Sequence, residues 1–210
     1  MLPTPNYRLT EKQKESVYDP AEDSFLLMDA IEMEIEVLRT LGPRVAVEVG
    51  VGSGVISAFL AKALEGHCKL ISLGTDRNPD ACDATRETAR LNAVAIDVVQ
   101  CDLVSALLPR VAGFVDVLMF NPPYVPTSDE AASDLERCWA GGEKGISTLN
   151  RFLPIVPDLL SARGLFYLVA LKENDIPALL THNPRLRGSV VVERRAGIEY
   201  LYILKFEKNQ

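Results

Sequence analysis

Runs of β-branched and apolar residues alternate with helical stretches along most of this chain, and the alternation limits the folds that are open to it. Strands joined by helical crossovers lie parallel, because each crossover returns the chain to the same end of the sheet. The pattern predicts an α/β fold with a doubly wound, mostly parallel sheet. The expected strands are 45–49, 70–75, 96–100, 115–120 and 164–171, with a closing pair at 190–193 and 200–204. The expected helices are one that Asp23 or Ser24 caps and that ends near 41, then 55–65, 79–91, 103–108, a stretch ending near 162, and 173–181.

Length and composition fit a single domain. The chain has 210 residues, of which 48% are hydrophobic, and this is enough to bury one sizeable core. Residues 1–16 are polar and contain prolines, so we expect a flexible N-terminal tail followed by one domain over 17–210.

A glycine-rich turn follows the first expected strand. Gly50, Gly52 and Gly54 let the backbone turn tightly and let a ligand approach without a Cβ in its way. A phosphate-binding lysine is absent, and Val55 stands where a dinucleotide fingerprint has its last glycine. With Glu48 two residues before the first glycine, the turn suits a cofactor without a pyrophosphate, and S-adenosylmethionine fits that description.

Two more carboxylates come after successive strands. Asp76 stands where doubly wound folds place an acid against ribose hydroxyls, and Asp102 could accept a hydrogen bond from an adenine amino group. Each aspartate alone is more often a helix cap than a ligand. Parallel strands have their carboxyl ends on the same side of the sheet, so Asp76 and Asp102 are expected to lie close together. The pair favours a nucleoside site.

The strand at 115–120 runs into Asn121, Pro122, Pro123 and Tyr124. Two prolines cannot continue a sheet, so they end the strand and leave the Asn121 carboxamide directed outward. Since prolines have no N–H, the turn offers acceptors to a ligand with N–H groups, such as a neutral amide or an exocyclic amine. An ordinary strand-ending turn is the alternative for this motif on its own.

In order and spacing, these motifs resemble those of class I methyltransferases, and more closely the HemK-like protein-glutamine N5-methyltransferases, including the eukaryotic release-factor methyltransferase catalytic subunits. The resemblance spans residues 17 to 206 and is carried by segments 48–54, 75–79, 102–103 and 121–124, with further matches at 18–24, 139–142, 157–160 and 164–168. Arg77 departs from the usual aliphatic residue, and Ser24 stands where threonine is common.

The resemblance implies a seven-stranded Rossmann-like sheet in the order 3-2-1-4-5-7-6, with strand 96–100 at one edge. It implies methyl transfer from S-adenosylmethionine to the glutamine amide of the Gly-Gly-Gln motif in the translation termination factor, with S-adenosylhomocysteine as the second product. The implied cofactor-binding residues are Ser24, Glu48, Gly50, Gly52, Asp76, Asp102, Leu103 and Asn121; the catalytic residues are Asn121, Pro122 and Tyr124; the substrate-binding residues are Asn121, Pro122, Pro123 and Tyr124; no metal is expected.

In this mechanism the Asn121 side-chain oxygen and the Pro122 carbonyl accept the acceptor's N–H groups and aim its nitrogen at the methyl group. Tyr124 covers the planar amide. Other functions stay open on the sequence alone: methylation of adenine N6 or of a protein lysine, or a catalytically silent binding subunit. The net charge of −7 argues against unaided binding to a nucleic-acid backbone.

The resemblance also implies a partner, a small zinc-binding activator subunit. Strand 96–100 carries Ile96, Val98 and Val99 at the expected sheet edge, and such an edge has to be covered, charged or paired. We expect the activator to pair along it. The four cysteines and two histidines show no zinc-site spacing, and scattered thiols without a signal peptide predict a cytoplasmic protein that could also be nuclear. The role of the polar loop 125–145 stays open.

Overall fold

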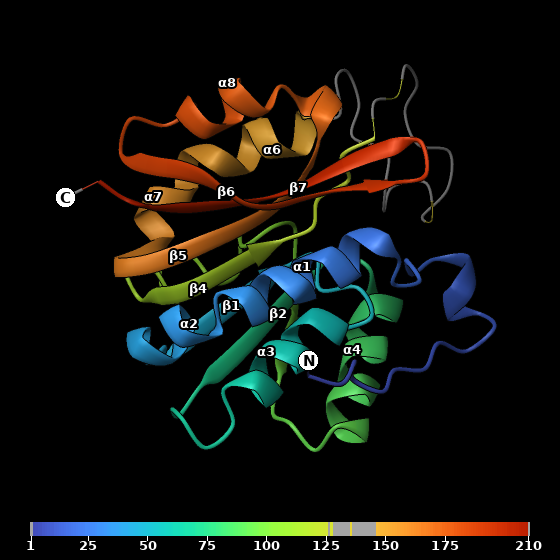
Figure 1. Cartoon of the computed structure of the whole chain (residues 1–210). Coiled ribbons are helices and arrows are strands. Elements are labelled where there is room, and N and C mark those ends of the chain that lie inside the picture. Colours follow the sequence, from blue (N-terminus) through green and yellow to red (C-terminus); the bar gives the residue numbers. More distant parts are fainter. Residues whose placement is uncertain (1, 126, 128–134, 136–145, 210) are drawn as a thin grey trace.

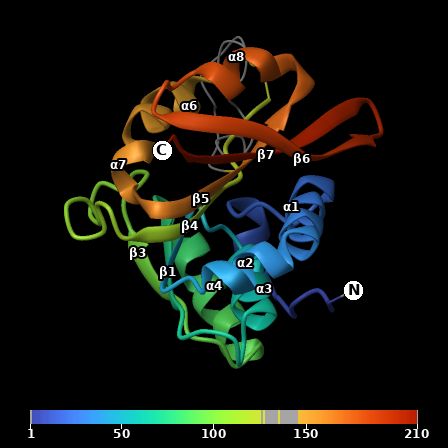
Figure 2. The same ribbon diagram turned by 60° about the vertical axis from the view of Figure 1, so that its left-hand side comes forward.

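The computed structural model describes residues 2–125, 127, 135 and 146–209. A seven-stranded sheet crosses the molecule with helices on both faces (Figures 1 and 2). Its order is β3-β2-β1-β4-β5-β7-β6; the first five strands of the chain are parallel, and β7 is antiparallel to both of its neighbours. The expected fold class and strand order are confirmed. The strands are β1 (Val45–Val49), β2 (Ile71–Asp76), β3 (Asp97–Gln100), β4 (Val115–Phe120), β5 (Leu160–Leu171), β6 (Leu186–Ala196) and β7 (Glu199–Lys208).

The helices fall into two groups, one on each face of the sheet. Helices α1, α2 and α3 lie on one face, and α6, α7 and α8 lie on the other. The described helices are α1 (Glu22–Met33), α2 (Ile35–Leu41), α3 (Val55–Ala63), α4 (Pro79–Leu91), α6 (Ser147–Phe152), α7 (Val156–Leu159) and α8 (Ile176–Thr181), with 3-10 turns η1 (Gln13–Glu15), η3 (Leu153–Ile155) and η4 (Lys172–Asn174). No helix in these ranges is long and apolar enough to cross a membrane.

The sheet has a separate core on each face because side chains alternate along every strand. In β5, Leu165, Tyr167 and Val169 pack with α1, α2 and α3. The intervening Phe166 and Leu168 pack with α6, α7 and α8. Burial on both faces explains why these strands are nearly continuous apolar runs in the sequence.

Several expected element boundaries are wrong. The first long helix begins at Glu22 after Ala21, so neither Asp23 nor Ser24 caps it, and it breaks at Glu34 into α1 and α2. Residues 103–108 form turns in place of a helix, because Leu103 adopts a φ of 51°, which a right-handed helix cannot include. The last helix before β5 ends at Leu159 and not near 162.

Residues 2–18, here called the N-terminal arm, contact α1 at Leu2 and α4 through the residues that follow. A flexible tail was expected over residues 1–16. In the structure, residues 2–16 make defined contacts. Asn6 and Asn92 exchange two hydrogen bonds, at 2.9 and 2.6 Å. Leu9 and Val17 are buried in one small cluster with Ala81 and Ala84 of α4.

Candidate active site

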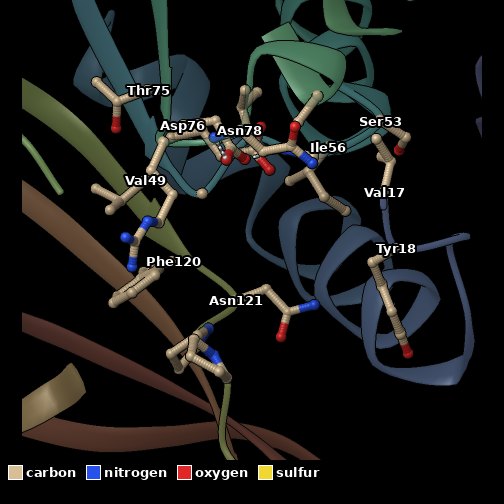
Figure 3. A pocket seen from close by; sticks show the side chains of 18 of the residues that line it. Val17, Tyr18, Val49, Ser53, Ile56, Thr75, Asp76, Asn78, Phe120 and Asn121 are labelled. Atoms are coloured by element: carbon tan, nitrogen blue, oxygen red, sulfur yellow. Dashed lines mark hydrogen bonds between the residues drawn. The ribbon is translucent and has the colours of Figure 1, made fainter. Parts of the chain in front are cut away.

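A cavity of about 460 Å³ lies at the carboxyl ends of the parallel strands. Figure 3 shows it with Asn121 between the strand end that carries Phe120 and the N-terminal segment that carries Val17 and Tyr18. Its size is in the range of cofactor sites. The cavity brings together every residue that the sequence assigned to the site: Ser24, Glu48, Gly50, Gly52, Asp76, Asp102, Leu103, Asn121, Pro122, Pro123 and Tyr124.

The glycine turn between β1 and α3 takes a backbone path that other residues rarely adopt. Gly50, Gly52 and Gly54 have φ values of 66°, 53° and 79°. Around Gly52 the space is open, since an added Cβ would meet no atom closer than 3.9 Å. At Gly54 an added Cβ would lie 2.8 Å from the side chain of Thr85 in α4. The first two glycines therefore leave room for a ligand, whereas the third lets α3 and α4 pack closely.

Asp76, at the end of β2, holds the glycine turn in place. One carboxylate oxygen accepts a hydrogen bond from the Gly52 N–H at 3.1 Å, and the other accepts from the Asn78 N–H at 2.9 Å. Burial raises the pKa of Asp76 above its usual value despite these donors. A carboxylate in this environment gains from further donors, and the hydroxyls of a ribose would supply them.

Glu48 is fully buried at the end of β1. Its Oε2 accepts hydrogen bonds from the Ser57 N–H, at 2.9 Å, and from the Ser57 hydroxyl. Burial raises the pKa of Glu48 to about 8, because removal from water penalises the charged form more than Ser57 stabilises it. A cationic group in the cavity would favour the ionised form, so this position suits a positively charged ligand.

Asp102 forms an ion pair with Arg151 of α6, and the side chains are 50% and 57% exposed. Both residues line the cavity, so this contact places α6 beside the proposed adenine position. The neighbouring Leu103 also lines the cavity, at the positive φ described above.

Asn121 lines the cavity and carries a buried acceptor without a partner in the described part of the chain. Its Nδ2 donates to Asp23 Oδ2 at 2.8 Å, whereas its Oδ1 is buried without a partner among the described residues. A buried polar atom without a hydrogen bond is costly, and a ligand N–H would satisfy it. Tyr124 is buried beside it and donates its hydroxyl to the same Asp23 oxygen at 2.8 Å. Burial, followed by the charge of Asp23, raises the pKa of Tyr124 far above its usual value, so the hydroxyl stays protonated.

Three residues of this site were not predicted from the sequence, namely Asp23, Tyr18 and Arg151. Asp23 was expected to cap a helix, but its carboxylate contacts Asn121, Tyr124 and Tyr18. The resemblance of segment 18–24 was the available signal for Asp23 and Tyr18. Arg151 had none, because it lies in an ordinary helix whose position depends on the tertiary fold.

Two further expectations concern other features of the chain. Most of the loop 125–145, including segment 139–142, lies outside the described residues. Within the described ranges, no three His, Cys, Asp or Glu side chains gather in a way that could hold a metal ion.

Sequence comparisons give matches over most of the chain. Residues 23–197 match the model of a family described as "Methyltransferase small domain". The chain is 48% identical to "Methyltransferase HEMK2" of Homo sapiens over 92% of this chain and 90% of that protein. It is 32% identical to the "eRF1 methyltransferase catalytic subunit mtq2" of Schizosaccharomyces pombe over 98% of this chain and 95% of that protein.

A solved structure agrees with these matches. A chain of the E. cuniculi Mtq2-Trm112 complex, described as responsible for methylation of the eRF1 translation termination factor, superposes with a TM-score of 0.69. The two chains are 28% identical, and the match covers 92% of this chain and 99% of the other.

Proposed function

Because the chain belongs to the Methyltransferase small domain family, we propose that it transfers a methyl group from S-adenosylmethionine to the glutamine side chain of the Gly-Gly-Gln motif in the eukaryotic translation termination factor. The relatives named for eRF1 methylation support this substrate. The observation that carries the proposal is the unpartnered Oδ1 of Asn121 beside the cavity, which matches the N–H of a side-chain amide.

The residues around the cavity fit S-adenosylmethionine. When bound, this cofactor supplies a methyl group that is electrophilic because it is attached to a sulfonium. Glu48 would lie nearest the cationic part of the molecule, Asp76 would bind the ribose hydroxyls, and Asp102 with Leu103 would hold the adenine. The open turn at Gly50 and Gly52 admits the cofactor, and Ser24 lines the end of the cavity near Asn121.

The acceptor needs positioning more than it needs a base. An amide nitrogen is a poor nucleophile because its lone pair is delocalised, so its alignment with the methyl group carries much of the rate enhancement. Asn121 Oδ1 and the Pro122 carbonyl accept the two N–H groups and hold the nitrogen in line. These acceptors also stabilise the positive charge that grows on the nitrogen during transfer. The Tyr124 ring packs against the amide plane.

An exocyclic adenine amine or a lysine amine would meet the same acceptors. The net charge of −7 disfavours a nucleic-acid substrate. A silent binding subunit is a poorer fit, because the acceptor and all three cofactor acids are present at one cavity.

The proposal includes a partner. We assign this chain as the catalytic subunit of a heterodimer with a small activator, which the resemblance describes as zinc-binding, in the cytoplasm or the nucleus. The activator would pair along β3, which forms one edge of the sheet. Asp97 and Gln100 are exposed there, and Val98 and Val99 are half-buried. Ile96 does not belong to this surface, because it is buried against Ala58 and Ala89.

A methyl-transfer assay with radiolabelled S-adenosylmethionine tests the substrate. It compares the intact termination factor, a factor whose motif glutamine is replaced, a histone and duplex DNA, each with the chain alone and with the activator. We expect label on the intact factor only, with the activator present. Asn121→Ala should keep cofactor binding and lose most of the transfer. Label on the glutamine-replaced factor, the histone or the DNA at an equal rate would overturn the assignment.

A further inference from the structure

Asp23 meets five hydrogen-bond donors in the first turn of α1 and is only 3% exposed. Its Oδ1 accepts from the Ser24 N–H at 2.6 Å and from the Ser24 and Tyr18 hydroxyls, both at 3.2 Å. Its Oδ2 accepts from Asn121 Nδ2 and from the Tyr124 hydroxyl, both at 2.8 Å. All five donors are neutral, and the amino-terminal end of α1 adds a favourable dipole. The carboxylate is thus held in one orientation by neutral donors.

We propose that Asp23 is a positioning residue that decides which atom of the Asn121 carboxamide faces the acceptor. The inference rests on the proposed function, in which Asn121 accepts an N–H from the substrate. Asp23 also lines the cavity, and the role that we assign to it is exerted through Asn121.

A carboxamide needs such a partner because its two ends have nearly the same shape. The oxygen accepts hydrogen bonds, whereas the NH₂ group only donates them. A rotation of half a turn would place N–H against the N–H of the acceptor amide and block a productive complex. A carboxylate can only accept, so Asp23 binds the NH₂ end of Asn121 and leaves Oδ1 free to accept from the substrate amide.

The same oxygen of Asp23 also anchors Tyr124, and this gives the motif a second constraint. Asn121 and Tyr124 lie on either side of two prolines whose φ angles are fixed. With both side chains bound to one buried oxygen, the acceptor and the aromatic ring keep a fixed relation. A positional error near 1 Å at such a site can cost on the order of 100-fold in rate.

Three variants test the inference through hydrogen-bond complementarity. Asp23→Asn can turn its own NH₂ toward residue 121, and we expect kcat to fall by about 100-fold while cofactor affinity changes little. Asn121→Asp places two carboxylates at one contact and should be at least as impaired. The double variant exchanges the two side chains, so the carboxamide at position 23 can donate to the carboxylate at position 121. The second oxygen of that carboxylate then takes the place of Asn121 Oδ1, and we expect kcat to recover by at least about tenfold over the better single variant.

The exposed neighbour Glu22 supplies the control, since Glu22→Gln removes the same charge from the same helical turn and should leave kcat unchanged. A purely structural role for Asp23 predicts that the defects of the two single variants add and that no recovery occurs. That result, or unchanged kcat in Asp23→Asn, would overturn the inference.

A measurement without turnover separates this inference from the proposed function. In wild-type protein labelled with ¹⁵N, the Asn121 NH₂ protons should exchange slowly with solvent, because they are bound to a buried carboxylate. In Tyr124→Phe, which leaves the Asp23–Asn121 contact in place, they should stay slow; in Asp23→Asn they should exchange faster. Fast exchange in the wild type would refute the inference even if termination-factor methylation is confirmed. Slow exchange that Asp23→Asn abolishes would support it even if the true acceptor is a lysine.

Discussion

Glu48 shows how one buried carboxylate couples the cofactor site to pH. Its pKa is raised from 4.5 to about 8 by burial, so the folded protein holds a proton that the unfolded chain releases. Between these values the folded state binds more protons, and its free energy of unfolding must fall as the pH rises. The loss is on the order of a few kcal/mol across this window.

We therefore predict that Glu48→Gln, which keeps an acceptor for Ser57, flattens the decline in stability from pH 5 to pH 8. Urea unfolding of the cofactor-free protein between pH 5 and pH 8 measures this change in the free energy of unfolding. Glu65→Gln, at an exposed position beside Lys62, serves as the control and should keep the wild-type slope. A variant at Glu48 with the full wild-type slope would mean that another group titrates.

The sequence predicted the residues that end strands better than it predicted their neighbours. Glu48, Asp76 and Asn121 follow from strand ends and turn residues, whose chemistry is local. The contact between the Asp23 carboxylate and Asn121 joins residues 98 apart in sequence, so local spacing could not predict it.

At the scale of elements, runs of β-branched and apolar residues predicted all seven strands, but helix ends depended on distant contacts. Glu34 is an ordinary helix residue, yet the helix breaks there, and its side chain accepts from Lys205 and Tyr167 of the sheet. Similarly, nothing in the sequence of 103–108 indicates the positive φ of Leu103. At Glu34, tertiary contacts prevailed over local helix propensity.

The close packing of α3 against α4 at Gly54 predicts that a larger residue at this position lowers the stability of the fold. Gly54→Ala adds a Cβ that would lie 2.8 Å from the Thr85 side chain and 2.9 Å from its Cα. Gly66 has nearly the same φ, 78° against 79°, and nothing within 4 Å of an added Cβ. We expect Gly66→Ala to cost about 1–2 kcal/mol from backbone strain alone. Gly54→Ala should cost about 1–3 kcal/mol more, because helix and turn must shift.

Thermal and urea unfolding of the two variants give the difference directly. Equal losses of stability in the two variants would show that α4 can shift at Thr85 to accept the added Cβ without a loss of stability. Cofactor affinity should also drop in Gly54→Ala alone, since Gly52 shares the turn with Gly54.

At the scale of the whole molecule, the sheet has two edges, formed by β3 and β6. If the activator pairs along β3, the backbone amides of residues 97–100 should exchange more slowly with solvent in the heterodimer than in the isolated chain. The amides of β6 provide the internal control and should exchange at the same rate in both. Slower exchange at β6 with no change at β3 would move the interface to the opposite edge.

The N-terminal arm has a kinetic consequence. Ser16, Val17 and Tyr18 line the cavity, and Ser16 is bound to α4 through the Asn78 side chain at 2.6 Å and through Asp80 at 3.1 Å. A ligand in the cavity would contact this part of the arm, and we expect its departure to require local detachment of the arm from α4. The residence time of the product would then depend on how often the arm opens. Removal of residues 2–15 should raise the dissociation rate of S-adenosylhomocysteine in stopped-flow measurements more than it changes the association rate, and turnover limited by product release would quicken with it.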